Sequence, residues 1–468
     1  MKSKKVDMLN GKIFPALVKF TIPVALSALL QLLYNAADIM VVGQFAVEEA
    51  VGAVGATSSL NHLVIGLFTG FGVGVNVVVG QRIGAGKEKE VPRIINNSLV
   101  LSVCSGVFVM FVGLFFSEPL LNIMQTPDGI IDLSAKYFRI VMLGAPALLI
   151  YNFCAAALRA YGDTKRPLIY LASSGLVNVA FNVLFVVGFG MDVDGVAIAT
   201  VISQYMAAAM VLHALLKEKS CCRIEPKKMK LDSYEIWQII KIGAPAGIYG
   251  MMFSLSNVII QSATNSFDSA QVVSGIAAAS SLEGFIWTAM NAVSIGTVSF
   301  VSQNWGAKNF QRIKRIQRDS ILMVFMIWSV MAAAFFLLQR PLFGLYLPND
   351  SLAVQYGMQR TYIIISTYFL AGIMDALTGS IRGMGYSTIT SVISFLGSCV
   401  VRVVWIYAVF YPLKGDLSIE KSLFSLYLAY PVSWILTIIG LYICFSIYFN
   451  RGKRKLVTPA LEKNDNIC

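Results

Sequence analysis

The chain has 468 residues, of which 57% are hydrophobic and only 13% are charged, and its mean hydropathy is +0.70. A water-soluble protein is about 45–50% apolar and about 25% charged. Many of the apolar blocks are longer than the roughly 20 residues that a helix needs to cross a bilayer. The composition excludes an ordinary soluble protein and predicts an all-α, polytopic membrane protein.

The net charge of +12 does not indicate a nucleic-acid partner, because the basic residues fall in short loops between apolar blocks. The seven cysteines are scattered, and only Cys221 and Cys222 are adjacent. No Cys-x-x-Cys spacing occurs, so neither a metal site nor a disulfide framework is predicted. We expect no cofactor and no nucleic acid, and the lipid bilayer is the surrounding partner.

Apolar blocks between charged or turn-forming breaks predict twelve helical spans. In chain order they cover residues 15–43, 51–79, 94–116, 137–158, 167–189, 194–216, 236–264, 272–302, 319–339, 355–379, 387–411 and 423–449. Several are too long for a helix perpendicular to the membrane, so tilted or bent helices are expected.

The basic residues are divided unequally between the two sides of these spans. About 30 of the 37 fall on the side of the two termini, and the few on the other side include Arg360, near the start of the tenth span. Arg402 alone falls inside a span. Because positive loops stay in the cytoplasm, we expect a multi-pass protein of the cell (plasma or inner) membrane with both termini cytoplasmic.

The chain also contains an internal repeat. Three motifs recur about 222 residues later, namely Lys-Phe-Thr-Ile-Pro23 and Lys-Ile-Gly-Ala-Pro245, Gln81-Arg-Ile-Gly-Ala and Gln303-Asn-Trp-Gly-Ala, and Leu-Arg-Ala-Tyr-Gly162 and Ile-Arg-Gly-Met-Gly385. Six spans in each half enter the membrane from the same side, so the repeat is parallel. Paired halves around a central cavity are typical of transporters.

The repeat predicts four parts of the chain. These are an N-terminal six-helix lobe at 1–216, a cytoplasmic linker at 217–235, a C-terminal six-helix lobe at 236–450 and a cytoplasmic tail at 451–468. We expect the cavity to lie between the two lobes.

The motifs beginning at Gln81 and Gln303 resemble the Gln/Gly-Ala signature of the multidrug and toxic compound extrusion (MATE) transporters. Leu-Arg-Ala-Tyr-Gly-Asp163, the proline pair and Asp38 in the first span are similar as well, and the resemblance covers about residues 10–450. It implies a secondary antiporter, not an enzyme. Such a protein exports amphipathic, often cationic, organic molecules in exchange for Na+ or H+ by alternating access through a twelve-helix, two-lobed fold.

Ionisable groups inside membrane spans are costly and are functional by default. Three other polar residues of the spans are expected to accompany Asp38 in one site. Asn178 and Asn182 are spaced i, i+4 on one helix face, and Thr200 lies in the next span. Carboxylate, amide and hydroxyl oxygens are ligands for hard cations. In the resembled family the N-terminal lobe has a cation site of this composition, but some members carry Asp where Asn182 stands. The choice between Na+ and H+ therefore stays open, as does a purely structural role for the amides.

Glu283, Asp375 and Arg402 are the candidates for a second titrating site. Many members of the resembled family have a Glu in the seventh span, where this chain reads Asn257-Val-Ile-Ile-Gln261. Arg402 is the one base available inside the spans, so it is also expected as a partner that neutralises either acid in a buried pair.

Two further groups of residues are candidates. Pro23 and Pro245 interrupt helical hydrogen bonding and are predicted hinges, with a fixed kink as the alternative. The polar span residues expected to line a substrate cavity are Gln31, Tyr34, Asn35, Asn152, Gln261 and Asn291.

The alternative function is a flippase of lipid-linked sugars, or of another amphiphile, from the same wider superfamily. A pyrophosphate substrate would require several intramembrane Arg or Lys residues, and only Arg402 is expected there. No motif of an intramembrane enzyme occurs in the spans. We expect the protein to function as a monomer.

Overall fold

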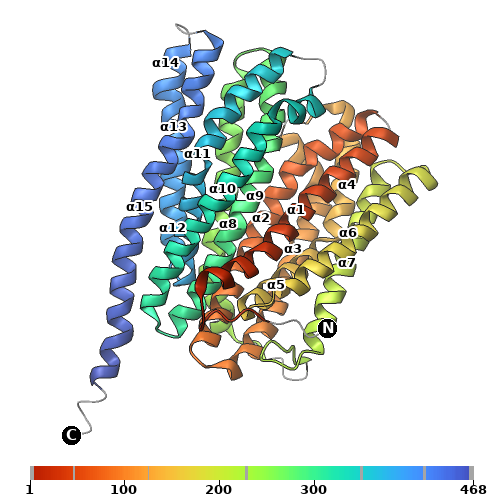
Figure 1. Ribbon diagram of the computed structural model, residues 1–468. Coiled ribbons are helices and arrows are strands. Elements are labelled where there is room, and N and C mark those ends of the chain that lie inside the picture. Colours follow the sequence, from red (N-terminus) through yellow and green to blue (C-terminus); the bar gives the residue numbers. More distant parts are fainter. Residues whose placement is uncertain are drawn as a thin grey trace. The chain divides into compact units, whose positions relative to one another are not determined.

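The computed structural model of the chain describes residues 5–45, 48–124, 126–226, 230–347, 351–414 and 418–462. Within these ranges every regular element is helical and no strand occurs (Figure 1). The α-helices are α1 (Ile13–Phe45), α2 (Glu48–Gly84), α3 (Val91–Ile123), α4 (Asp128–Leu143), α5 (Ala145–Tyr161), α6 (Lys165–Val183), α7 (Val193–Leu216), α8 (Ser233–Asn265), α9 (Ala270–Gly306), α10 (Phe310–Tyr346), α11 (Ser351–Gly383), α12 (Ser387–Ser394), α13 (Val401–Trp405), α14 (Tyr411–Lys414) and α15 (Ile419–Glu462).

The described residues contain eleven helices that are long and apolar enough to cross a bilayer. Helices α4 and α5, bent by 47° relative to each other, bring the number to twelve when they are counted as one span. The bend lies at Gly144, and Pro146 follows in the first turn of α5. Proline has no N–H for the i−4 hydrogen bond, which explains why the helix breaks there. The predicted twelve spans are confirmed, but the fourth, expected as one helix over 137–158, is a bent pair.

The predicted eleventh span, 387–411, is also not a single α-helix. It is made of α12, α13 and α14, separated by π-helical segments at Phe395–Val400 and Ile406–Phe410. The three helices follow one another along α15 (Figure 1). A π-helical turn closes over one more residue than an α-helical turn, so each segment shifts which side chains face the neighbouring helix. Arg402 lies between the two segments, and its side chain is fully buried.

The chain divides into two compact units. The first comprises residues 1–8 and 22–251, and the second comprises residues 9–21 and 252–468. Helices α1 and α8 therefore each contribute to both units. The boundaries predicted for the two lobes, the linker and the tail stay a prediction.

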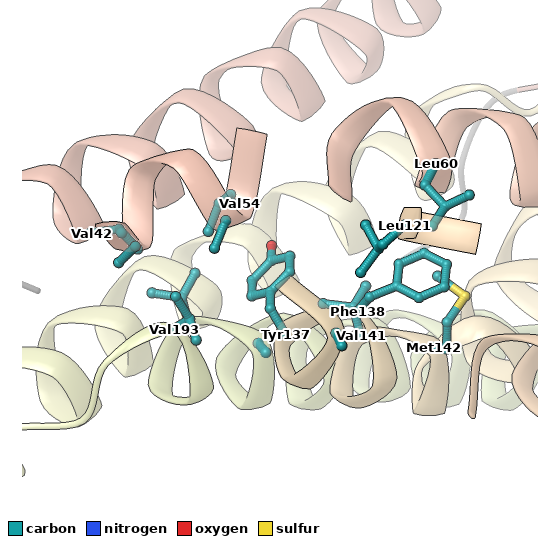
Figure 2. Packing of buried hydrophobic residues seen from close by; sticks show 14 of the residues in the cluster. Val42, Val54, Leu60, Leu121, Tyr137, Phe138, Val141, Met142 and Val193 are labelled. Carbon is teal, nitrogen blue, oxygen red and sulfur yellow. The ribbon is translucent and has the colours of Figure 1, made fainter. Parts of the chain in front are cut away.

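A hydrophobic cluster in the first unit is built around α4 (Figure 2). Tyr137, Phe138, Val141 and Met142 are all buried there, and their spacing places them along one side of the helix. Met142 packs onto Gly113 of α3, where an added Cβ would lie 2.0 Å from the Met142 Cγ. The close approach of α3 and α4 thus requires a residue without a side chain at position 113.

The predicted linker, 217–235, belongs to the first unit, and partly buried polar contacts join it to α3 and α6. Asn96 of α3 donates from Nδ2 to the carbonyl of Glu225 at 3.1 Å and accepts from the Glu225 N–H at 3.2 Å. Near the start of this segment Arg166 donates to the Glu218 carboxylate at 2.5 Å. Burial raises the pKa of Glu218, but the hydrogen bond and charge of Arg166 outweigh it, so this pKa lies below its usual value.

Candidate functional site

Asp38 lies in α1, and its side chain is buried, with 7% of the residue exposed. Its Oδ1 accepts a hydrogen bond from Asn182 Nδ2 at 2.5 Å. Its Oδ2 accepts one from Thr200 Oγ1 at 3.4 Å. The carboxylate is therefore held by side chains of α6 and α7, which lie far from it in the sequence.

Asn178 completes this arrangement. Its Nδ2 donates to Thr200 Oγ1 at 3.3 Å, and its Oδ1 accepts from Asn182 Nδ2 at 3.4 Å. Both asparagines are buried in α6, one helical turn apart, so their amides point the same way. The structure thus brings together the four residues predicted as a cation site, and we call Asp38, Asn178, Asn182 and Thr200 the carboxylate ring.

The carboxylate ring has an acceptor without a donor. Asn182 Oδ1 is buried and accepts no hydrogen bond from any described residue, while its Nδ2 lies between oxygens of Asp38 and Asn178. A half-turn of this amide would place Oδ1 where Nδ2 now lies, next to those oxygens. The ring would then offer carboxylate, amide and hydroxyl oxygens, the kind of ligands that hard cations take.

The ring borders a cavity of about 520 Å³ in the first unit. Asp38, Asn178 and Thr200 line it, and Asp38 is the only carboxylate among the described residues that do. No lysine or arginine occurs among those lining residues. Four of the residues predicted for a substrate cavity also line it, and these are Gln31, Tyr34, Asn35 and Asn152.

Two glycines make room for cavity side chains. A Cβ at Gly175 of α6 would lie 1.8 Å from Tyr34 Cζ, so the tyrosine ring rests directly on the helix backbone. A Cβ at Gly144 would lie 2.0 Å from Gln204 Oε1, so the bend between α4 and α5 also accommodates a cavity residue. Neither these glycines nor Gln204 could be predicted from the sequence, because no local motif marks a contact between distant helices.

Gly175→Ala is expected to displace the Tyr34 ring and reshape the cavity. Overpacking of this kind costs about 1–3 kcal/mol of stability, and we expect a raised KM for transported dyes from the altered wall. The measurement is dye transport at a series of concentrations. Gly55→Ala is the matched control, because an added Cβ there meets nothing within 4 Å. An unchanged KM in Gly175→Ala would contradict the role given to Tyr34.

The acid predicted in the eighth span has a different partner from the one expected. Arg360 of α11 donates from Nε and Nη2 to the two carboxylate oxygens of Glu283 at 3.0 and 2.9 Å. Both residues are buried. The expectation that Arg402 neutralises Glu283 is therefore wrong, because Arg360 does so. Arg360 is also a buried residue and not one of the basic residues outside the spans, with which it was counted. Residue 360 falls inside the predicted tenth span, 355–379, and not in a loop. This position was the sequence signal that could have identified Arg360 as an interior residue.

Arg402 is held mainly by aromatic residues of the second unit. Its Nε donates to Ser433 Oγ at 3.1 Å, and its guanidinium carbon lies 4.4 Å from the ring centre of Tyr430. The guanidinium of Arg360 lies 5.5 Å from the same ring. Tyr430 therefore contacts both buried guanidinium groups through its electron-rich ring.

The remaining candidates of the second unit lie next to other residues of that unit. The backbone carbonyl of Asp375 accepts from Ser294 Oγ at 2.8 Å. Gln261 donates to Asn265 Oδ1 at 3.0 Å, one turn further along α8. Neither Gln261 nor Asn291 is among the residues that line the cavity of the first unit.

Both predicted hinge prolines lie inside continuous helices. Pro23 is in α1 and Pro245 is in α8. The carbonyl of Pro23 accepts a hydrogen bond from Ser27 Oγ at 2.8 Å. Bending at either proline stays a prediction.

An all-helical membrane protein with a buried carboxylate beside a cavity has the construction of a membrane transporter. The family model MatE matches residues 23–184 and again residues 245–408. The chain belongs to this family, the multidrug and toxic compound extrusion transporters whose motifs it resembles. The two matches begin at Pro23 and Pro245, which are the first pair of the internal repeat.

Named relatives agree with this assignment. The probable multidrug resistance protein YoeA of Bacillus subtilis (strain 168) is 24% identical over 452 residues, covering 95% of each chain. The probable multidrug resistance protein YpnP of the same organism is 28% identical over 399 residues, covering 85% of this chain and 89% of the relative. A solved structure described as the outward-facing conformation of a multidrug resistance MATE family transporter matches with a TM-score of 0.88. It is 20% identical, and the match covers 97% of this chain and 100% of that one, which establishes the fold.

Proposed function

We propose that the protein is a secondary antiporter that exports amphipathic, often cationic, organic molecules in exchange for Na+ or H+. The observation that carries the proposal is the carboxylate ring beside the cavity of about 520 Å³. The multidrug resistance relatives support the same class of substrate.

The chemistry of the ring explains how an ion gradient would be coupled to export. A buried carboxylate is stable when a cation neutralises it, and Na+, H+ or a cationic substrate can each do so. Conformations that differ in the hydration of Asp38 differ in their affinity for that cation. This difference in affinity is what couples ion binding to a conformational change.

The charge of the cavity favours cations over anions. Asp38 provides the only negative side chain among the described lining residues, and no lysine or arginine among them compensates it. A lipid-linked sugar carries a pyrophosphate, which needs basic ligands. The lining residues therefore favour an exporter of cations over a flippase of lipid-linked sugars.

Bending of α1 would connect the carboxylate ring to a larger movement. At a rise of 1.5 Å per residue, Pro23 and Asp38 are separated by about 22 Å along the helix. Because proline removes one hydrogen bond from the helix, a change at Asp38 would be relayed to a flexible point in the same element. Pro245 occupies the matching position in α8.

We further propose that the protein functions as a monomer in the cell membrane with both termini in the cytoplasm. A fluorescent protein fused after Cys468 is then expected to fluoresce, and alkaline phosphatase fused at the same place is expected to be inactive. The reverse pattern would contradict this orientation.

Everted membrane vesicles that contain the protein test the proposed function. Export from the cell corresponds to uptake into such vesicles. A Na+ concentration or a proton concentration that is higher inside the vesicles than outside is therefore expected to drive accumulation of ethidium. The gradient that works identifies the coupling ion. Equal accumulation with and without either gradient would overturn the proposed antiport.

A further inference from the structure

A second cavity, of about 550 Å³, lies in the second unit and has no place in the proposed transport cycle. It is a groove between α11, the end of the interrupted span α12–α14, and the start of α15. The residues that line this groove are Gln359, Trp405, Val409, Leu413, Glu420, Lys421, Phe424, Ser425 and Leu428. We call it the α15 groove.

The α15 groove has a charged end and an apolar body. Glu420 and Lys421 stand in the first turn of α15, at the level where one span ends at Lys414 and the next begins at Ile419. From Glu420 the groove follows α15 for two turns to Leu428, about 12 Å deeper into the span. A charged end at the membrane surface and an apolar remainder inside the span suit a lipid molecule, whose headgroup is charged and whose acyl chains are apolar.

Hydrogen bonds hold the walls of the α15 groove in place. The Glu420 carboxylate accepts from Gln355 Nε2 at 3.2 Å, and its backbone carbonyl accepts from Gln359 Nε2 at 2.6 Å. Trp405 donates from Nε1 to the carbonyl of Ser425 at 2.9 Å. These hydrogen bonds join α11 and α13 to the start of α15 and thereby hold Glu420 and the indole ring in place.

Lys421 is the group available to a ligand. Its side chain is exposed, and within the described parts of the chain no carboxylate lies within 4.0 Å of its ammonium group. Lys414, at the same end, differs because its Nζ donates to Ser266 Oγ at 2.8 Å and lies 4.8 Å from the Phe267 ring centre. The groove therefore presents one fixed carboxylate and one ammonium group side by side.

We propose that the α15 groove binds one phospholipid whose headgroup carries a primary ammonium group, a phosphatidylethanolamine. Its phosphate pairs with Lys421, its ammonium group donates to Glu420, and one acyl chain lies along Trp405 and Leu428. The choice of lipid follows from charge. A phosphatidylglycerol has no cation for Glu420, and the methylated ammonium of a phosphatidylcholine has no N–H to donate.

Native mass spectrometry of the purified full chain tests this assignment with phosphatidylethanolamine, phosphatidylcholine and phosphatidylglycerol of identical acyl chains. Wild type is expected to retain the first lipid at least about tenfold better than either of the others, as one additional hydrogen bond to a charged group would provide. Lys421→Ala and Glu420→Gln are expected to lose this preference, while Lys414→Ala keeps it. Equal retention of the three lipids by wild type, or equal losses in Lys421→Ala and Lys414→Ala, would overturn the proposal.

Fluorescence provides a readout that does not depend on the charged residues. Phosphatidylethanolamine with brominated acyl chains quenches a tryptophan that it touches, so it is expected to quench wild type more strongly than Trp405→Phe. Equal quenching of the two proteins would place the lipid elsewhere and contradict the site. Because neither measurement involves transport, the lipid site and the proposed antiport succeed or fail separately.

Discussion

Asp38→Asn is expected to abolish ethidium accumulation driven by an ion gradient in everted vesicles. The substitution keeps the size of the side chain but replaces one of the two accepting oxygens with an amide N–H donor. It also removes the one negative charge among the described residues that line the cavity. Without that charge neither Na+ nor H+ binding differs between conformations, so the coupling free energy is lost. Couplings of this kind are typically about 1–3 kcal/mol, or about 5–150-fold.

The control for this result is Glu118→Gln, which neutralises an acid at an exposed ion pair with Arg139. Surface changes of this type usually alter stability by no more than about 0.5 kcal/mol, so accumulation should stay at the wild-type rate. Asn182→Asp adds an acid inside the carboxylate ring and is expected to change the dependence of transport on pH. Full gradient-driven transport by Asp38→Asn would rule out the assignment of Asp38 as the coupling residue.

Removing one partner of the buried ion pair in the second unit is expected to have the largest effect on stability. Arg360→Met leaves the Glu283 carboxylate buried with its principal hydrogen-bond donor removed. The loss of one partner from a buried pair costs about 3–5 kcal/mol. A clear drop in the apparent melting temperature, followed in detergent by the amount of protein that stays monodisperse after heating, measures this cost.

Two further variants separate charge burial from packing. The double variant Glu283→Leu with Arg360→Met removes both charges and should recover most of the lost stability, because an apolar pair of similar volume often replaces a buried ion pair without cost. Arg139→Met breaks an exposed pair and should cost no more than about 1 kcal/mol. Equal destabilisation by Arg360→Met and Arg139→Met would contradict the importance given to the buried pair.

The carboxylate ring illustrates what could be predicted from the sequence. Asp38 was found because a charge inside an apolar block is rare. Asn178 and Asn182 were found because their i, i+4 spacing fixes one helix face whatever surrounds it. That these side chains lie within hydrogen-bonding distance of one another depends on helix packing, which the family resemblance implied and the structure describes.

The bend at Gly144 and the π-helical segments around Arg402 could not be predicted in the same way. Hydropathy finds an apolar block whether its helix is straight or broken, so 137–158 and 387–411 were both expected to be regular. Pro146 was a local signal for the first irregularity. The second has no such signal in the sequence, because it depends on how α12–α14 pack against α15.

Arg360 shows the limit of assigning charges to loops. Its position near the start of a span allowed it to be counted with the outer charges, whereas the structure pairs it with Glu283 in the interior. The partner lies 77 residues away in the chain. No periodic pattern connects two single charges on different helices, so only the packing of α9 against α11 reveals the pair.

The most direct test of the central proposal is the release of the coupling ion when substrate binds to the purified protein. Ethidium is added in weakly buffered solution, and Na+ is followed with a selective electrode while H+ is followed with a pH indicator. We predict that wild type releases one of the two ions and that Asp38→Asn releases neither. Equal release from wild type and Asp38→Asn would contradict the proposal that Asp38 holds the coupling ion.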